Sequence, residues 1–128
     1  MTLFFDRSVG VTIPQTLLRL KPPVDVAYHQ EHFAFDEADD VWIPEVTKWG
    51  WFIIGQDYSY HKNPSELTAM KQHGAAVFYL WGAEAKKWEA LRCFARGFDN
   101  ILRKTETDTR PYAYTVQKHG GVTELYLP

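Results

Sequence analysis

Short apolar runs alternate with helix-like segments along most of the chain, and this alternation limits the folds that the chain can adopt. The runs are rich in β-branched and aromatic residues, as buried strands are, and they lie at residues 2–5, 24–29, 51–56 and 75–81. Two alternating segments joined by the turn sequence KHGG indicate a final hairpin, at 112–117 and 122–127. Strands that alternate with helices form mostly parallel sheets, because the crossovers are right-handed. The pattern therefore predicts a three-layer α/β fold with helices on both faces of the sheet and a C-terminal β-hairpin.

Helix boundary signals mark the connecting segments of the first half. Segment 12–20 has the apolar spacing of a helix, and Thr12 is expected to cap its start. A second helix surrounds Pro44, whose missing N–H predicts that the regular part begins only near Ile43. The acidic stretch 35–40 is then expected to form a loop.

Two longer helices are expected in the second half. Segment 63–74 starts with Asn63 as the N-cap, followed by a proline, and it ends at Gly74. Segment 83–104 carries apolar side chains at spacings of three and four, which predicts a long amphipathic helix. The apolar stripe that we expect to be buried consists of Trp88, Leu91, Ala95, Phe98 and Leu102.

The composition fits one folded domain over residues 1–128, because 45% of the residues are hydrophobic and 23% are charged. With a net charge of −2, the chain lacks the basic field of a general nucleic-acid coat or an anionic-membrane binder. The single cysteine, Cys93, excludes an intrachain disulfide and suits a reducing compartment. No apolar stretch of about 18 residues and no leader sequence is seen, so we expect a cytoplasmic protein that does not contact membranes.

Acidic residues follow two of the expected parallel strands. Asp6 comes directly after the first strand and Asp57 after the third. Parallel strands end at the same edge of a sheet, where open α/β folds bind ligands, so these carboxylates are expected to meet. Asp39 and Asp40 precede a helix that must run back across the sheet, and we expect them to join the other two.

Carboxylates that meet in this way need compensation, because two of them about 4 Å apart repel by roughly 4 kcal/mol at an effective dielectric near 20. Either one or more of them is protonated, or a divalent cation lies between them. Mg²⁺ or Mn²⁺ suits such oxygen ligands and can promote phosphodiester hydrolysis, which makes a metal-dependent phosphodiesterase the sharper hypothesis. The plainer interpretation is that each acid is a turn or capping residue. Glu66 is a further metal candidate, although it also fits a capping box behind Asn63, and Glu45 could be simply solvated.

Basic and polar residues near this edge and along the long helix are candidates for contacts with a nucleic-acid substrate. The alternative is that they are ordinary loop residues and a solvated helix face. His29 and His32 are expected at the surface, and without further nitrogen or sulfur ligands they do not indicate zinc. The substrate candidates are Arg7, Ser8, His61, Lys62, Arg92 and Arg96.

Two stretches together resemble a compact PIN-like domain. They are the strand-end acid with its nearby serine in FFDRS, and the acids, short helix and buried strand of DDVWIPEVTKWGWFIIGQD. The following NPSEL and the long helix extend the resemblance over most of the chain, which is most similar to the short branch of VapC-type toxins. The resemblance implies a Mg²⁺- or Mn²⁺-dependent ribonuclease, the toxin of a type II toxin–antitoxin pair, which a separate antitoxin protein neutralises.

The resemblance also implies roles for individual residues. Asp6 matches the first strand-end acid of the family, Asp39 or Asp40 the acid before the short helix, and Asp57 the last strand-end acid. We expect Asp6, Asp40 and Asp57 to be catalytic. The family's further acid has no clear counterpart here, and the candidates to replace it are Glu45 and Glu66.

Two other functions compete with the ribonuclease. A PIN-like fold that lacks one acid could be a catalytically inactive protein-interaction module. A response-regulator receiver domain fits the length and Asp57, but receivers pair two acids after the first strand and place a lysine after the last, and neither is evident here. The aromatic content of 16% exceeds what a small core readily hides. Some aromatic residues are therefore expected at an interface with an antitoxin or with a second copy in a homodimer.

Overall fold

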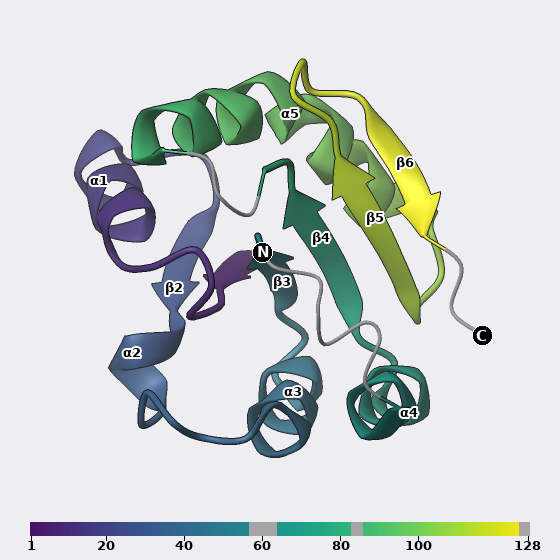
Figure 1. The fold of residues 1–128 in the computed structure, drawn as a ribbon. Coiled ribbons are helices and arrows are strands. Elements are labelled where there is room, and N and C mark those ends of the chain that lie inside the picture. Colours follow the sequence, from purple (N-terminus) through teal and green to yellow (C-terminus); the bar gives the residue numbers. More distant parts are fainter. Residues whose placement is uncertain (57–63, 83–85, 126–128) are drawn as a thin grey trace.

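The computed structural model describes residues 1–56, 64–82 and 86–125. Its centre is a six-stranded sheet in the order β2-β1-β3-β4-β5-β6 (Figure 1). Neighbouring strands from β2 to β5 are parallel, and β6 is antiparallel to β5, so the predicted α/β fold with a C-terminal hairpin is confirmed. The strands are β1 (Thr2–Phe5), β2 (Asp25–Tyr28), β3 (Phe52–Gly55), β4 (Ala76–Leu80), β5 (Tyr112–Val116) and β6 (Val122–Leu125).

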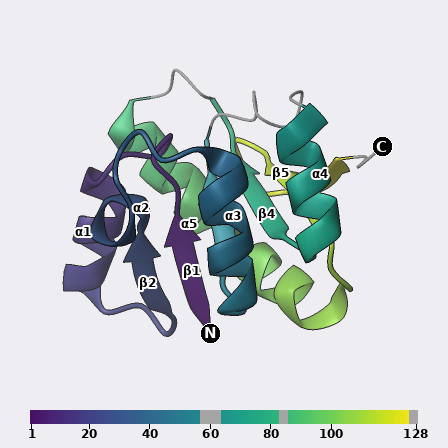
Figure 2. The same cartoon turned by 90° about the horizontal axis from the view of Figure 1, so that it is seen from below.

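Helices cover both faces of the sheet, and each face has its own apolar core (Figures 1 and 2). Side chains alternate along the strands, so that Phe5 and Phe78 pack beneath α1 and α5, while Phe4 and Tyr79 belong to the core beneath α3 and α4. This arrangement gives the three predicted layers. The helices are α1 (Thr12–Leu20), α2 (His29–His32), α3 (Asp39–Lys48), α4 (Pro64–His73) and α5 (Lys87–Thr107).

The ends of the shorter helices show which boundary signals hold. Gly74 follows α4 with a φ of 72°, the left-handed conformation that glycine adopts readily, so the predicted end of this helix is confirmed. The predicted cap of α1 is wrong, because Val11 occupies the N-cap position and no side chain caps the helix. Helix α2 was not expected from the sequence.

Helix α3 begins earlier than its proline suggests. It starts at Asp39 rather than near Ile43, and Pro44 lies inside the helix. Pro44 cannot donate to the carbonyl of Asp40, four residues before it, so only one backbone hydrogen bond is missing. Asp39 and Asp40 therefore lie in the first turn of a helix instead of a loop, where the helix dipole favours negative charge.

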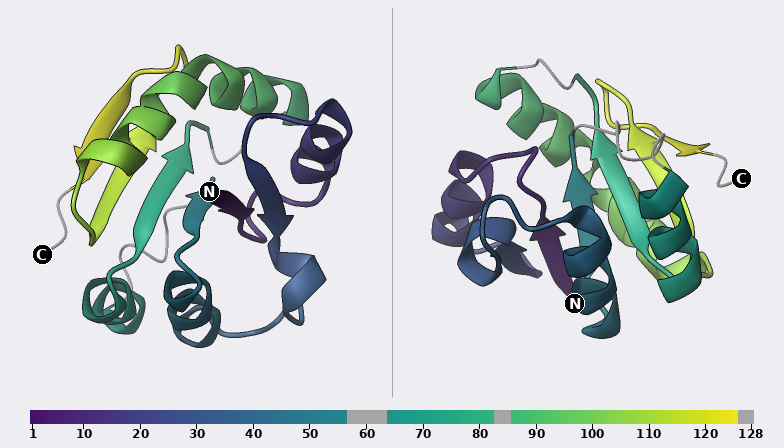
Figure 3. Two further views of the ribbon diagram at one scale, coloured as in Figure 1. Left: turned by 180° about the vertical axis from the view of Figure 1, so that it is seen from behind. Right: turned by 60° about the horizontal axis from the view of Figure 1, so that its bottom comes forward.

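Helix α5 buries a different stripe from the expected one. Its buried residues are Ala90, Cys93, Phe94, Gly97 and Ile101. The predicted stripe lies on the adjoining side of the helix, and Trp88 within it is 67% exposed. Gly97 explains why this stripe faces the sheet. A Cβ atom at position 97 would lie 2.6 Å from Val116 Cγ1, so the glycine allows α5 to approach β5 closely (Figure 3). Within the described part of the chain, no helix has the length and apolar character needed to cross a membrane.

Candidate functional site

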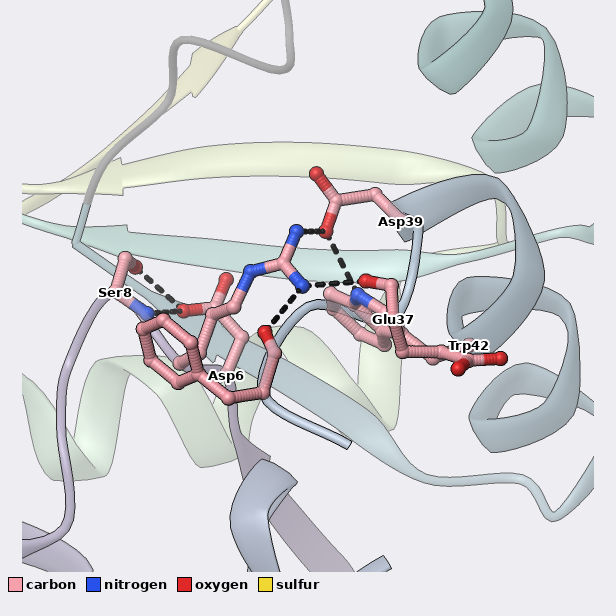
Figure 4. A network of polar contacts seen from close by, with 7 residues as sticks. Asp6, Ser8, Glu37, Asp39 and Trp42 are labelled. Carbon is pink, nitrogen blue, oxygen red and sulfur yellow. Dashed lines mark hydrogen bonds and ion pairs between the residues drawn. The ribbon is translucent and has the colours of Figure 1, made fainter. Parts of the chain in front are cut away.

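The carboxylate of Asp6 is held at the carboxyl edge of the sheet by the turn that follows β1. Asp6 is only 2% exposed. Its Oδ1 atom accepts a hydrogen bond of 2.8 Å from the Ser8 N–H and a second from the Ser8 hydroxyl (Figure 4). The Gln56 N–H in turn donates to Ser8 Oγ at 2.9 Å. The ends of the adjacent strands β1 and β3 are thus joined, and the orientation of the Asp6 carboxylate is set by its own turn.

Arg7 connects this turn to the start of α3. Its Nη2 atom lies 2.7 Å from Asp39 Oδ1, and Nη1 donates to the carbonyls of Phe35, at 2.9 Å, and Glu37. The same Asp39 oxygen accepts a hydrogen bond of 2.7 Å from the indole N–H of Trp42 (Figure 4). The acidic segment before α3 therefore approaches the end of β1, as the topology predicts.

The two acids at the start of α3 have different surroundings. The Asp39 side chain is 13% exposed and has two fixed donors. Asp40, the next residue, is exposed to solvent. Asp39 is therefore the member of the pair whose carboxylate orientation is set by the fold.

The other acidic and basic candidates of this edge differ in how much of them the structure describes. Asp57, His61 and Lys62 lie outside the described residues, although Asp57 directly follows Gln56 in the sequence. Glu66 belongs to the first turn of α4, and its side chain lies outside the description. Glu45 is exposed on α3.

The four substrate candidates that the structure describes belong to two different regions. Arg7 and Ser8 belong to the hydrogen-bond networks around Asp39 and Asp6. Arg92 and Arg96 are exposed on α5, and Arg92 lies 3.4 Å from Glu89. Lys87, which the sequence did not single out, is closer to the Asp6 turn, because its ammonium group donates to the Val9 carbonyl.

His29 is buried against this site, so the expectation of a surface position is wrong. It is fully excluded from solvent between Phe33 and Trp42, with ring centroids 5.5 and 5.6 Å away. Neither ring nitrogen has a hydrogen-bond partner among the described residues. Burial lowers the pKa of His29 below its ordinary value, Arg7 lowers it further, and the Asp39 carboxylate partly opposes both. No sequence spacing signals this position, which depends on the unexpected helix α2.

The oxygen donors at this edge suit a hard divalent cation in kind. Asp6 and Asp39 supply carboxylates from two elements that Arg7 connects. Their number is incomplete, since residues 1–56, 64–82 and 86–125 contain no group of three or more His, Cys, Asp or Glu side chains placed to hold a metal ion. The further ligands that the sequence predicts include Asp57 and Glu66, whose side chains lie outside the description.

Comparison with known proteins identifies the family. Residues 1–82 match the family described as PIN like domain, a family of nucleases whose members typically use divalent metals. The match does not distinguish a branch within that family. No curated protein and no solved structure gives a significant match. The matched region includes Asp6, Asp39 and Gln56 and covers 82 of the 128 residues. The chain therefore belongs to the PIN-like domain family.

Proposed function

We propose that the protein is a Mg²⁺- or Mn²⁺-dependent endoribonuclease, a cytoplasmic toxin of a type II toxin–antitoxin pair that a cognate antitoxin neutralises. The observation that carries the proposal is the buried carboxylate of Asp6 in a chain of a nuclease family. It lies at the end of a central parallel strand, and its turn is joined to Gln56 and, through Arg7, to Asp39.

The ligands of the ion would be Asp6, Asp39 or Asp40, and Asp57, with Glu66 or Glu45 as candidates for a further acid. A bound Mg²⁺ or Mn²⁺ would make water a better nucleophile and neutralise phosphoryl charge. Ser8 holds the Asp6 carboxylate in one orientation, which lowers the cost of ordering it on binding. Arg7 holds the Asp39 carboxylate and compensates its charge while no ion is bound.

The test replaces Asp6 by asparagine. Asp6→Asn keeps an oxygen that can accept both hydrogen bonds from Ser8, so the fold should remain while the carboxylate charge is lost. We expect Mn²⁺-dependent cleavage of RNA to fall by about 100-fold or more, with loss of growth arrest on expression. The matched control is Asp99→Asn, which removes an exposed carboxylate from α5. An active Asp6→Asn protein, or a wild-type protein inactive with both metals, would contradict the proposal.

A groove between α1 and α5 supports the part of the proposal that concerns the antitoxin. It has a volume of about 420 Å³, and its apolar walls include Leu17 and Leu20 near α1 and Trp88, Leu91 and Phe98 from α5. Arg92 also lines it and could pair with an acidic side chain. These features fit an amphipathic helix of an antitoxin with acidic residues beside its apolar face.

The second candidate is a PIN-like module that binds proteins and has no nuclease activity. Asp39 favours it, because one of its oxygens already accepts hydrogen bonds from Arg7 and Trp42. Titration of the wild-type protein with Mn²⁺ by calorimetry separates the two candidates. The enzyme requires binding that Asp6→Asn abolishes, whereas the module predicts none.

A further inference from the structure

A second pocket lies at the carboxyl ends of β4 and β5, and neither Asp6 nor Asp39 lines it. Its volume is about 370 Å³, which is within the range of small-molecule sites. Its walls combine an aromatic ring with polar groups, unlike the apolar groove between α1 and α5. The lining residues are Tyr79, Leu80, Trp81, Gly82, Thr115, Val116 and Gln117.

Trp81 gives this pocket an accessible aromatic ring. It is 38% exposed, and among the described residues no aromatic ring packs against it. Trp49 and Trp51, by contrast, pack against each other with ring centroids 4.8 Å apart. The ammonium group of Lys118 lies over the Trp81 ring, 5.2 Å from its centroid. A tryptophan ring next to a cation can stack on a nucleobase while the cation attracts a phosphate.

Polar side chains lie on the β5 side of the pocket. Gln117 Nε2 donates a hydrogen bond of 2.8 Å to Thr115 Oγ1, which orients the carboxamide of an otherwise exposed side chain. The carboxamide keeps its oxygen and one N–H for the edge of a base. The Thr115 hydroxyl donates to the Thr123 carbonyl, 3.4 Å away, and keeps one acceptor position. Lys118 and His119, which follow in the turn between β5 and β6, are both exposed.

A chain of hydrogen bonds links the pocket to Asp6. Gln56 Nε2 donates to the Gly82 carbonyl in the pocket wall at 2.8 Å, and the Gln56 N–H donates to Ser8, the residue that holds Asp6. Neighbouring strands are about 4.8 Å apart, so the ends of β1 and β5 are separated by roughly 14 Å along this edge. An extended single strand whose phosphate lay at Asp6 could therefore place a nearby base at Trp81.

We infer that this pocket binds an unpaired nucleobase of single-stranded RNA, by stacking on Trp81 with Lys118 near the adjoining phosphate. The inference rests on the proposed ribonuclease function, because it concerns the RNA that this enzyme would cleave. Thr115 and Gln117 contact the edge of the base, and Gln56 keeps the pocket in a fixed position relative to Asp6.

The test measures RNA binding without cleavage. A fluorescein-labelled oligouridylate is titrated with the Asp6→Asn protein in EDTA, and its anisotropy is followed. Adding Trp81→Ala should raise Kd by roughly 5- to 100-fold, because one stacked base is lost, whereas Trp81→Phe should retain most of the affinity. The matched control is Trp88→Ala, which removes an exposed tryptophan of α5 and should leave Kd unchanged.

An oligouridylate with abasic positions separates stacking from a structural effect. At an abasic position there is no base to stack on Trp81. The Asp6→Asn protein should therefore bind this probe equally well with and without Trp81→Ala. Weaker binding would mean that Trp81→Ala distorts the carboxyl edge of the sheet. In the wild-type background, Trp81→Ala should raise KM and leave kcat unchanged.

The outcomes distinguish this inference from the ribonuclease itself. RNA cleavage by the wild-type protein with no effect of Trp81→Ala on Kd or KM overturns the pocket and leaves the enzyme. Binding of RNA that depends on Trp81, without cleavage in Mg²⁺ or Mn²⁺, supports the pocket and overturns the enzyme. Equal weakening with the normal and abasic probes overturns the stacking role.

Discussion

Among single residues, His29 is expected to make the free energy of unfolding depend on pH. Both ring nitrogens are buried and have no hydrogen-bond partner in the part of the chain that the structure describes. Burial, reinforced by Arg7, lowers the pKa of His29 below 6.5. The unfolded chain therefore binds a proton at a higher pH than the folded protein does. Because the unfolded state then binds more protons, the free energy of unfolding decreases as the pH falls through 6.5 towards the folded pKa.

We predict that urea denaturation of the wild-type protein will show this loss, by up to about 1.4 kcal/mol for each pH unit in that window. His29→Phe keeps a ring to pack against Phe33 and Trp42 and has no titrating group, so the loss should become smaller. The matched control is His73→Gln at an exposed position of α4. A pH dependence that is unchanged in His29→Phe would show that other groups cause it.

At the scale of elements, Arg7 connects β1 to the start of α3 rather than extending into solvent. Its side chain is 27% exposed, and its donors bind Asp39 and two carbonyls of the preceding loop. From these contacts we expect Arg7 to contribute to stability, and its predicted contact with RNA phosphates stays a separate prediction.

We predict that Arg7→Met will lower the free energy of unfolding by about 1.5–3 kcal/mol, because the partly buried Asp39 carboxylate loses a charged hydrogen-bond donor. In the Arg7→Met protein, the slope of log K for RNA binding against log salt should be the same as in the wild-type protein. Lys118→Met is the comparison, since loss of a phosphate contact lowers the slope of log K against log salt by about 0.7 for a single strand. A similar drop in slope for Arg7→Met would mean that Arg7 contacts phosphate.

Helix α5 approaches β5 closely at one glycine. A Cβ atom at position 97 would meet Val116 Cγ1 at 2.6 Å, and Val116 is fully buried and has a stiff β-branched side chain. We predict that Gly97→Ala will destabilise the protein by about 1–3 kcal/mol, although alanine is the better helix former.

The double variant of Gly97→Ala and Val116→Ala tests the cause of this loss. Removing the Val116 methyl groups opens space for the new Cβ, so the two changes together should cost less than their sum in urea denaturation. Strict additivity would mean that the clash is relieved in some other way.

At the scale of the whole molecule, the chain has two separate surfaces that could bind partners. The carboxyl edge of the sheet carries Asp6 and the Trp81 pocket, and the groove between α1 and α5 is apolar with Trp88 at its wall. Because none of the residues that line the groove belongs to the turn around Asp6, binding in the groove can be disrupted without changing that turn.

We predict that Trp88→Ser will weaken binding of the protein encoded by the adjacent reading frame by about 30-fold or more, because loss of a central tryptophan from an interface typically costs at least about 2 kcal/mol. RNA cleavage in the absence of that partner should not change. Val41→Ser, at an exposed apolar position on α3, is the matched control for calorimetry. If Trp88→Ser instead separates a homodimer in sedimentation, the groove holds a second copy of this chain.

Local sequence patterns were sufficient to predict the architecture and the place of the first acid. Alternating strands and helices require a mostly parallel sheet, and a strand-end acid in such a sheet lies at its carboxyl edge, as Asp6 does. Both conclusions depend on local patterns, which the chain carries before it folds. The glycine after α4 and the final hairpin could be predicted for the same reason.

Where local patterns allow two equivalent alternatives, contacts that form in the folded chain select one of them. Helix α5 has apolar residues around much of its surface, and periodicity cannot say which stripe meets the sheet; the close approach at Gly97 does. Neighbouring acids Asp39 and Asp40 look alike in sequence, and only Asp39 meets Arg7, which lies 32 positions away in the chain. The burial of His29 likewise comes from rings that distant segments supply. These outcomes depend on contacts between remote residues, which no local pattern contains.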